Sequence, residues 1–229
     1  MMTFLESSLL PVVLTLGAFY AGQACQKKWK LPLFNPILIA AVLVIAFLLL
    51  TGMELDAYTA GNARLSWLMT PATIALAIPM YEQVQVLRKN LKAIVIGVAA
   101  GAVSCMAVLL AGAVAMGLGR TLTVSLLPKS VTTAIAVPLS QLQGGLTGVT
   151  VAAISVTGIF TNMAGVYLCK LFHITDETAQ GVAFGTAGHV IGTARAGELS
   201  RLAGAVSSLS LVVAGLLTAV LLPVFAGLL

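Results

Sequence analysis

One lysine in an apolar stretch is the residue of this chain best suited to bind an anion. Lys129 lies within LLPKSVTTAIAVP, and a charge at membrane depth costs about 2.5–3.5 kcal/mol on insertion scales. Pro128 can occupy the first turn of a helix, which would place Thr132 and Thr133 on the face of Lys129. The cation, these hydroxyls, the adjacent Ser130 and free N–H groups at the helix start would together bind a small anion. The alternative is a lysine that extends to a lipid headgroup.

A second polar cluster lies in the glycine-rich stretch GTAGHVIGTARAGE, residues 185–198. His189 and Thr193 share a helical face, and a histidine can exchange a coupled proton near neutral pH. Arg195 can pair with Glu198 at the i+3 spacing. The glycines permit close helix packing or local unwinding. The alternative is a packing motif with one hydrogen-bonded histidine and a solvated Arg–Glu pair.

The other polar features are weaker. Asn35 and Pro36 are either a polar site in a broken helix or a cap and turn. Ser125 precedes Lys129 by the spacing of a serine–lysine dyad, but no oxyanion element accompanies it, which argues against a hydrolase. No metal-ligand or cofactor motif is found, so we expect a protein that is not an enzyme and has no cofactor. The predicted substrate-binding residues are Asn35, Lys129, Ser130, Thr132, Thr133, His189, Thr193, Arg195 and Glu198.

The elements that must position these residues are membrane helices. The chain has 229 residues, of which 59% are hydrophobic and 8% charged, whereas soluble domains carry about 25% charged residues. Lipid must therefore contact most of its surface, and the fold class is an all-α polytopic membrane helix bundle. Apolar runs predict about six full spans, at residues 9–24, 33–50, 65–81, 91–118, 146–171 and 202–229.

The basic residues lie in short connectors, which is how membrane orientation is encoded. Two of these connectors are predicted to be cytoplasmic, one with Lys27, Lys28 and Lys30 and the other with Arg88, Lys89 and Lys92. Both termini would then lie outside. The net charge of +5 consequently gives no indication of nucleic-acid binding.

Two segments do not fit this simple count. Residues 121–144 and 178–197 are apolar enough for membrane depth, yet helix breakers and polar groups interrupt both. They are either re-entrant hairpins or broken full crossings, because non-helical backbone at that depth must be satisfied by protein or by a water-filled cavity. Residues 66–79 also align without gaps on 125–138, a possible internal repeat. Paired interrupted segments of this kind are typical of secondary transporters.

The stretches LPLFNPILIA (31–40), LLPKSVTTAIA (126–136) and GTAGHVIGTARAGE (185–198) resemble the LrgB/CidB family. The resemblance covers essentially the whole chain and implies a single domain, residues 1–229. The sequence departs from the family pattern at Ala134, where a proline is common, and at Gly188 and Val190, which flank the histidine. These departures bear on substrate preference rather than on membership.

The resemblance implies two functions. Members are described as antiholin-like or murein-hydrolase (autolysis) modulators of the bacterial inner membrane, which work beside a small LrgA/CidA-type membrane partner. A plastid relative carries glycolate and glycerate, and some bacterial relatives are implicated in pyruvate movement. We therefore expect a carrier of small monocarboxylates in the lipid bilayer, or alternatively a regulator of autolysis that acts by homo- or hetero-oligomerisation.

Overall fold

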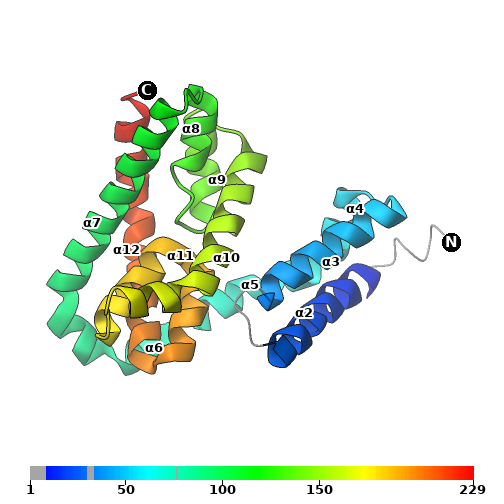
Figure 1. Cartoon of the computed structure of the whole chain (residues 1–229), viewed down its shortest axis with the longest axis horizontal. Coiled ribbons are helices and arrows are strands. Elements are labelled where there is room, and N and C mark those ends of the chain that lie inside the picture. The colour runs from blue at the N-terminus through cyan, green and yellow to red at the C-terminus, as the bar shows by residue number, and fades with distance from the viewer. Residues whose placement is uncertain (1–8, 30–33, 76) are drawn as a thin grey trace. The chain divides into compact units, whose positions relative to one another are not determined.

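The computed structural model describes residues 9–29, 34–75 and 77–229, and the regular structure in these ranges is helical, without strands (Figure 1). The chain forms two compact units, which meet in sequence at residue 76. The predicted span at 65–81 is divided between them, because one helix ends at Ala75 and the next begins at Ala77. An all-helical membrane bundle is thus confirmed.

The N-terminal unit contains α2 (Leu9–Trp29), α3 (Pro36–Thr51), α4 (Leu55–Gly61) and α5 (Ala63–Ala75). Helices α2 and α3 pack closely, since a Cβ on Gly22 would lie 2.6 Å from the carbonyl oxygen of Pro36. Asn35 begins α3: its side-chain oxygen accepts hydrogen bonds from the N–H groups of Ile37 and Leu38 at 2.8 and 3.3 Å. The cap-and-turn interpretation of Asn35 and Pro36 is therefore confirmed.

The C-terminal unit contains α6 (Ala77–Glu82), α7 (Val84–Ala115), α8 (Arg120–Leu126), α9 (Thr133–Leu142), α10 (Thr147–Leu171), α11 (Glu177–Leu199) and α12 (Arg201–Ala226). In the described residues, four helices are long and apolar enough to cross a membrane: α2, α7, α10 and α12. Helix α3 has 16 residues, fewer than the roughly 20 of a typical span. The protein is a multi-pass membrane protein.

The first interrupted segment is a hairpin, here called the first hairpin (residues 120–142). It consists of α8, a non-helical turn at residues 127–132, and α9. The backbone N–H of Leu146 donates to Ser125 Oγ at 2.7 Å, so the chain has returned to α8 when α10 begins. The segment therefore re-enters rather than crosses.

The second interrupted segment is also a hairpin, formed by the two arms of α11 on either side of His189 and here called the second hairpin (residues 177–199). His189 has φ 43° and ψ −138°, which breaks the helix. A Cβ on Gly192 would lie 2.4 Å from the carbonyl oxygen of Phe184. Residues eight apart in a straight helix are about 12 Å apart, so the second arm must fold back on the first.

The two hairpins enter from opposite ends of α12. At the base of the first, Arg120 donates to the carbonyl oxygen of Ala226, the last residue of α12. At the base of the second, Gly197 lies against Gly204, near the start of α12. Figure 1 shows α8 beside the C-terminus and α11 toward the other end of the unit. Helix α7 is followed by the first hairpin, and helix α10 is followed by the second. These two helix–hairpin units therefore form a repeat of opposite direction.

Residues 66–79 and 125–138, which align in sequence, do not share one local structure. Residues 66–75 are helical throughout, whereas residues 127–132 form the turn of the first hairpin. The inverted arrangement relates the two hairpins of the C-terminal unit to each other instead. It was not visible in the sequence alignment, because the first hairpin reverses over residues 127–132 and the second at His189, with different residues at the two turns.

Candidate functional site: a cavity between two hairpin tips

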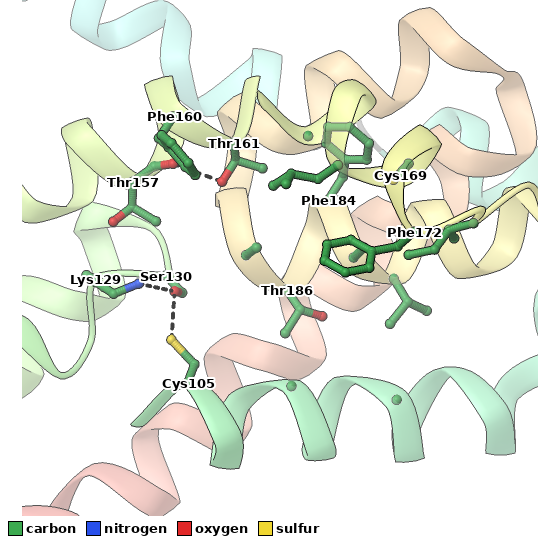
Figure 2. A pocket seen from close by; sticks show the side chains of 18 residues that line it. Cys105, Lys129, Ser130, Thr157, Phe160, Thr161, Cys169, Phe172, Phe184 and Thr186 are labelled. Carbon is green, nitrogen blue, oxygen red and sulfur yellow. Dashed lines mark hydrogen bonds between the residues drawn. The ribbon is translucent and has the colours of Figure 1, made fainter. Parts of the chain in front are cut away.

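A cavity of about 460 Å³ lies within the C-terminal unit, between α7, α10, the turn of the first hairpin and the first arm of the second (Figure 2). Its polar lining residues are Cys105, Lys129, Ser130, Thr157, Thr161, Cys169 and Thr186. Thr157 is ten residues from the start of α10, about 15 Å along the helix. The cavity therefore reaches the middle of a span, where transporters place their substrates.

Lys129 lies in the turn of the first hairpin, half-buried, and lines this cavity. Its Nζ donates to Ser130 Oγ at 3.5 Å, a long hydrogen bond, and Ser130 Oγ lies 3.5 Å from Cys105 Sγ. Among the described residues no carboxylate lies within 4.0 Å of the Lys129 ammonium. The ion pair that the described residues form is between Arg195 and Glu198. Lys129 also lines a second hollow of about 420 Å³ on the other side of Cys105.

The prediction that a helix starts at Pro128 is wrong. The residues from Leu127 to Ser130 form a turn, and α9 begins at Thr133 with Thr132 as its N-cap residue. The chain must reverse here to bring Leu146 back to Ser125, and the reversal uses the residues that would have formed the first helical turn. Thr132 is half-buried and Thr133 exposed, and neither lines the cavity. Thr132 makes no side-chain capping hydrogen bond, so the first N–H groups of α9 keep their capacity to donate.

His189 is the tip of the second hairpin and does not line the cavity. Its Nε2 donates to the carbonyl oxygen of Ile154 at 3.0 Å, and its ring occupies the space left by Gly158 on α10. Thr193 Oγ1 donates to the carbonyl oxygen of His189 and lies 2.9 Å from Ser207 Oγ on α12. His189 and Thr193 do not share a helical face, because the helix breaks at His189: the His189 ring packs on α10 and the Thr193 hydroxyl on α12. These contacts hold the hairpin tip in place.

The remaining predicted site residues do not line the cavity. Arg195 pairs with Glu198 as expected, and their side chains are 33% and 62% exposed. Asn35 caps α3 in the other unit. Of the predicted set, the structure thus brings Lys129 and Ser130 together at the cavity, while His189 and Thr193 hold the tip of the second hairpin.

Sequence reasoning missed Thr186 as a site residue. Thr186 lines the cavity, is 9% exposed, and its hydroxyl has no hydrogen-bond partner within the described part of the chain. A buried hydroxyl without a partner costs about 1–3 kcal/mol. The oxygen of Thr186 has almost no accessible surface, so a ligand can reach it only after the side chain rotates. The available sequence signal was its place in the glycine-rich stretch, between Gly185 and Gly188.

The Lys129 ammonium, with no carboxylate within 4.0 Å among the described residues and with the Ser130 hydroxyl beside it, can bind one small anion that also carries a hydrogen-bonding group. In a site of this kind the charge-assisted hydrogen bond is the strong interaction. The arrangement is suited to binding a small anion.

The pattern of the LrgB-like family matches residues 15–228. The antiholin-like protein LrgB of Bacillus subtilis (strain 168) is 34% identical over 225 residues, covering 96% of this chain and 97% of the relative. The proteins of the same name from Bacillus mycoides (strain KBAB4) and Bacillus cereus (strain B4264) are each 34% identical, covering 93% of this chain and 94% of the relative. No solved structure matches. With agreement across almost its full length, the chain belongs to the LrgB-like family.

Proposed function

We propose that this protein carries small monocarboxylates, the class of glycolate, glycerate, pyruvate and lactate, across the membrane. The observation that carries the proposal is Lys129, whose ammonium lines a cavity of about 460 Å³ and has no carboxylate within 4.0 Å among the described residues. An unpaired charge at this depth costs about 2.5–3.5 kcal/mol. A substrate carboxylate would supply the missing counter-charge.

The surrounding residues have distinct proposed roles. Lys129 binds the carboxylate, while the hydroxyl of Ser130 binds its second oxygen or the neighbouring hydroxyl or keto group. His189 and Thr193 hold the tip of the second hairpin against α10 and α12. Two interrupted segments of inverted direction that meet at mid-membrane are the usual setting of such a site.

The relatives favour a second function. Each bears the name antiholin-like protein, which supports a regulator of autolysis rather than a monocarboxylate carrier. Such a regulator would act by oligomerisation, with copies of itself or with a small LrgA/CidA-type membrane protein. The two functions are compatible, since flux of an organic acid changes the energetics of the membrane in which a partner acts.

We also propose that the protein resides in the bacterial inner membrane with both termini outside. Two re-entrant hairpins leave the orientation of the other helices unchanged, so the charge of the connectors still favours this topology. Lys27 and Lys28 at the end of α2 and Arg88, Lys89 and Lys92 at the start of α7 would face the cytoplasm.

Uptake by the purified protein in liposomes separates the two functions. The protein is reconstituted with and without a small LrgA-type partner and given labelled two- to four-carbon acids under an imposed pH gradient. Saturable uptake by the protein alone supports the carrier. Release of a trapped dye without saturable uptake of any acid would support the regulator and reject the carrier.

A further inference from the structure

The cavity has two chemically different ends. Lys129, Ser130 and Thr157 lie together at one end, beside Cys105, as Figure 2 shows. Residues at the other end are almost all apolar: Leu168, Cys169, Phe172, Ile174 and Val182. Phe184 lies between the two ends and is 1% exposed. A ligand held at Lys129 would therefore extend its remaining atoms over an apolar wall.

The cavity is also long for a small acid. Gly97 and Cys105 both line it and are eight residues apart on α7, which corresponds to about 12 Å. Thr157 and Cys169 line it on α10 and are twelve residues apart, about 18 Å. A water molecule occupies about 30 Å³ of liquid, so about 460 Å³ corresponds to some fifteen water-sized groups. A three-carbon acid has only about six non-hydrogen atoms and would leave most of the apolar end unfilled.

The polar groups that a ligand can reach are concentrated near Lys129. Thr186 is 9% exposed, and its hydroxyl oxygen has almost no accessible surface and no hydrogen-bond partner in the described part of the chain. Thr161 also lines the cavity, but its hydroxyl already donates to the carbonyl oxygen of Thr157. Farther along the first arm of α11 the lining residues are Val182, Ala183 and Phe184, none of which offers a polar side chain. Polar recognition is thus concentrated on the carboxylate and the carbon next to it.

We propose that the preferred substrates are 2-hydroxy or 2-keto monocarboxylates with an apolar body larger than that of lactate, such as a branched, straight-chain or aromatic side chain. The carboxylate binds Lys129, the 2-oxygen binds Ser130, and the side chain packs on Leu168, Phe172 and Val182. This inference rests on the proposed carrier function and names the substrate class of the same site.

A chain-length series tests the proposal. Uptake of labelled lactate into proteoliposomes is inhibited with unlabelled 2-hydroxy acids of three, four, five and six carbons and with phenyllactate, and protein-free liposomes give the passive background. Burial of each added methylene should tighten inhibition about fourfold. Inhibition that is equal along the series, or that weakens with length, would overturn the inference while leaving the carrier function intact. Absence of saturable lactate uptake would reject both.

Two matched variants test whether the apolar end of the cavity causes the tighter binding of longer acids. Ala183 is an exposed helical residue that lines the apolar end, and Ala179 is exposed one turn earlier on the same arm, outside the cavity. Leucine at either position is compatible with a helix. Ala183→Leu should reduce the advantage of the six-carbon acid over lactate at least tenfold, and Ala179→Leu should preserve it. If both variants show the same advantage of the six-carbon acid over lactate, the apolar end does not bind the substrate's side chain.

Discussion

Replacement of Lys129 by methionine tests the role assigned to its ammonium. Methionine keeps the length and most of the apolar volume of the side chain but removes its charge. Hydrogen bonds to charged groups contribute about 1.5–3 kcal/mol, so the substrate affinity of Lys129→Met should fall about 10- to 150-fold. The structure also predicts that stability is maintained, because among the described residues no carboxylate within 4.0 Å would lose its partner.

The assay combines uptake kinetics with thermal unfolding of the same detergent-solubilised protein. We expect a raised KM for lactate in Lys129→Met at an unfolding midpoint no lower than that of the unmodified protein. Lys129→Arg, which retains the positive charge, should recover part of the affinity. Unchanged KM in Lys129→Met would refute the assignment, and a lower unfolding midpoint with lost uptake would identify Lys129 as a structural residue.

Three further predictions concern the hairpins. Ser130→Ala removes the hydroxyl beside Lys129 and should weaken substrate affinity about 2- to 13-fold, the value of a neutral hydrogen bond. Gly192→Ala places a Cβ 2.4 Å from the carbonyl oxygen of Phe184 and should destabilise the protein by about 1–3 kcal/mol, whereas Gly112→Ala meets no atom within 4 Å and should be neutral or stabilising in the same unfolding assay. Gly101→Cys combined with Thr186→Cys, in a chain whose own cysteines are replaced, should form a disulfide on oxidation, because the two Cβ positions are 3.8 Å apart, the mean for disulfides.

Each of these predictions has a contradicting outcome. A Ser130→Ala protein with unaltered KM would mean that the hydroxyl does not bind substrate. Equal stabilities of Gly192→Ala and Gly112→Ala would show that the arms of the second hairpin are not in contact. Failure of the cysteine pair to crosslink, judged by mass spectrometry after oxidation, would contradict the packing of α11 on α7.

Composition and hydropathy were sufficient to predict the class of fold, because lipid leaves a strong signature in a chain with 8% charged residues. Proline and lysine at 128–129 also identified where the first segment is interrupted. The start of α9 was predicted five residues too early, since Pro128 is as compatible with a turn as with the first turn of a helix. The chain forms the turn in a structure where the distant Leu146 donates a hydrogen bond to Ser125, and the local sequence does not contain that contact.

The second hairpin shows what local sequence does not contain. Its many glycines predicted a break, but the break lies at His189, a residue with a side chain and a positive φ of 43°. Such a conformation costs about 1–3 kcal/mol and persists only where surrounding contacts impose it. Here those contacts come from Ile154, Gly158 and Ser207, on two other helices. The sequence could therefore indicate individual residues of the site, but not the packing of the two hairpins that brings them together.

Counterflow in proteoliposomes tests the carrier function most directly. Vesicles that contain the purified protein are loaded with a high concentration of unlabelled lactate and diluted into trace labelled lactate. A carrier with the site described here exchanges one for the other, so the label should rise transiently above its equilibrium level and do so far less in Lys129→Met. A monotonic approach to equilibrium, equal in both proteins, would indicate a leak or pore and contradict the proposed mechanism.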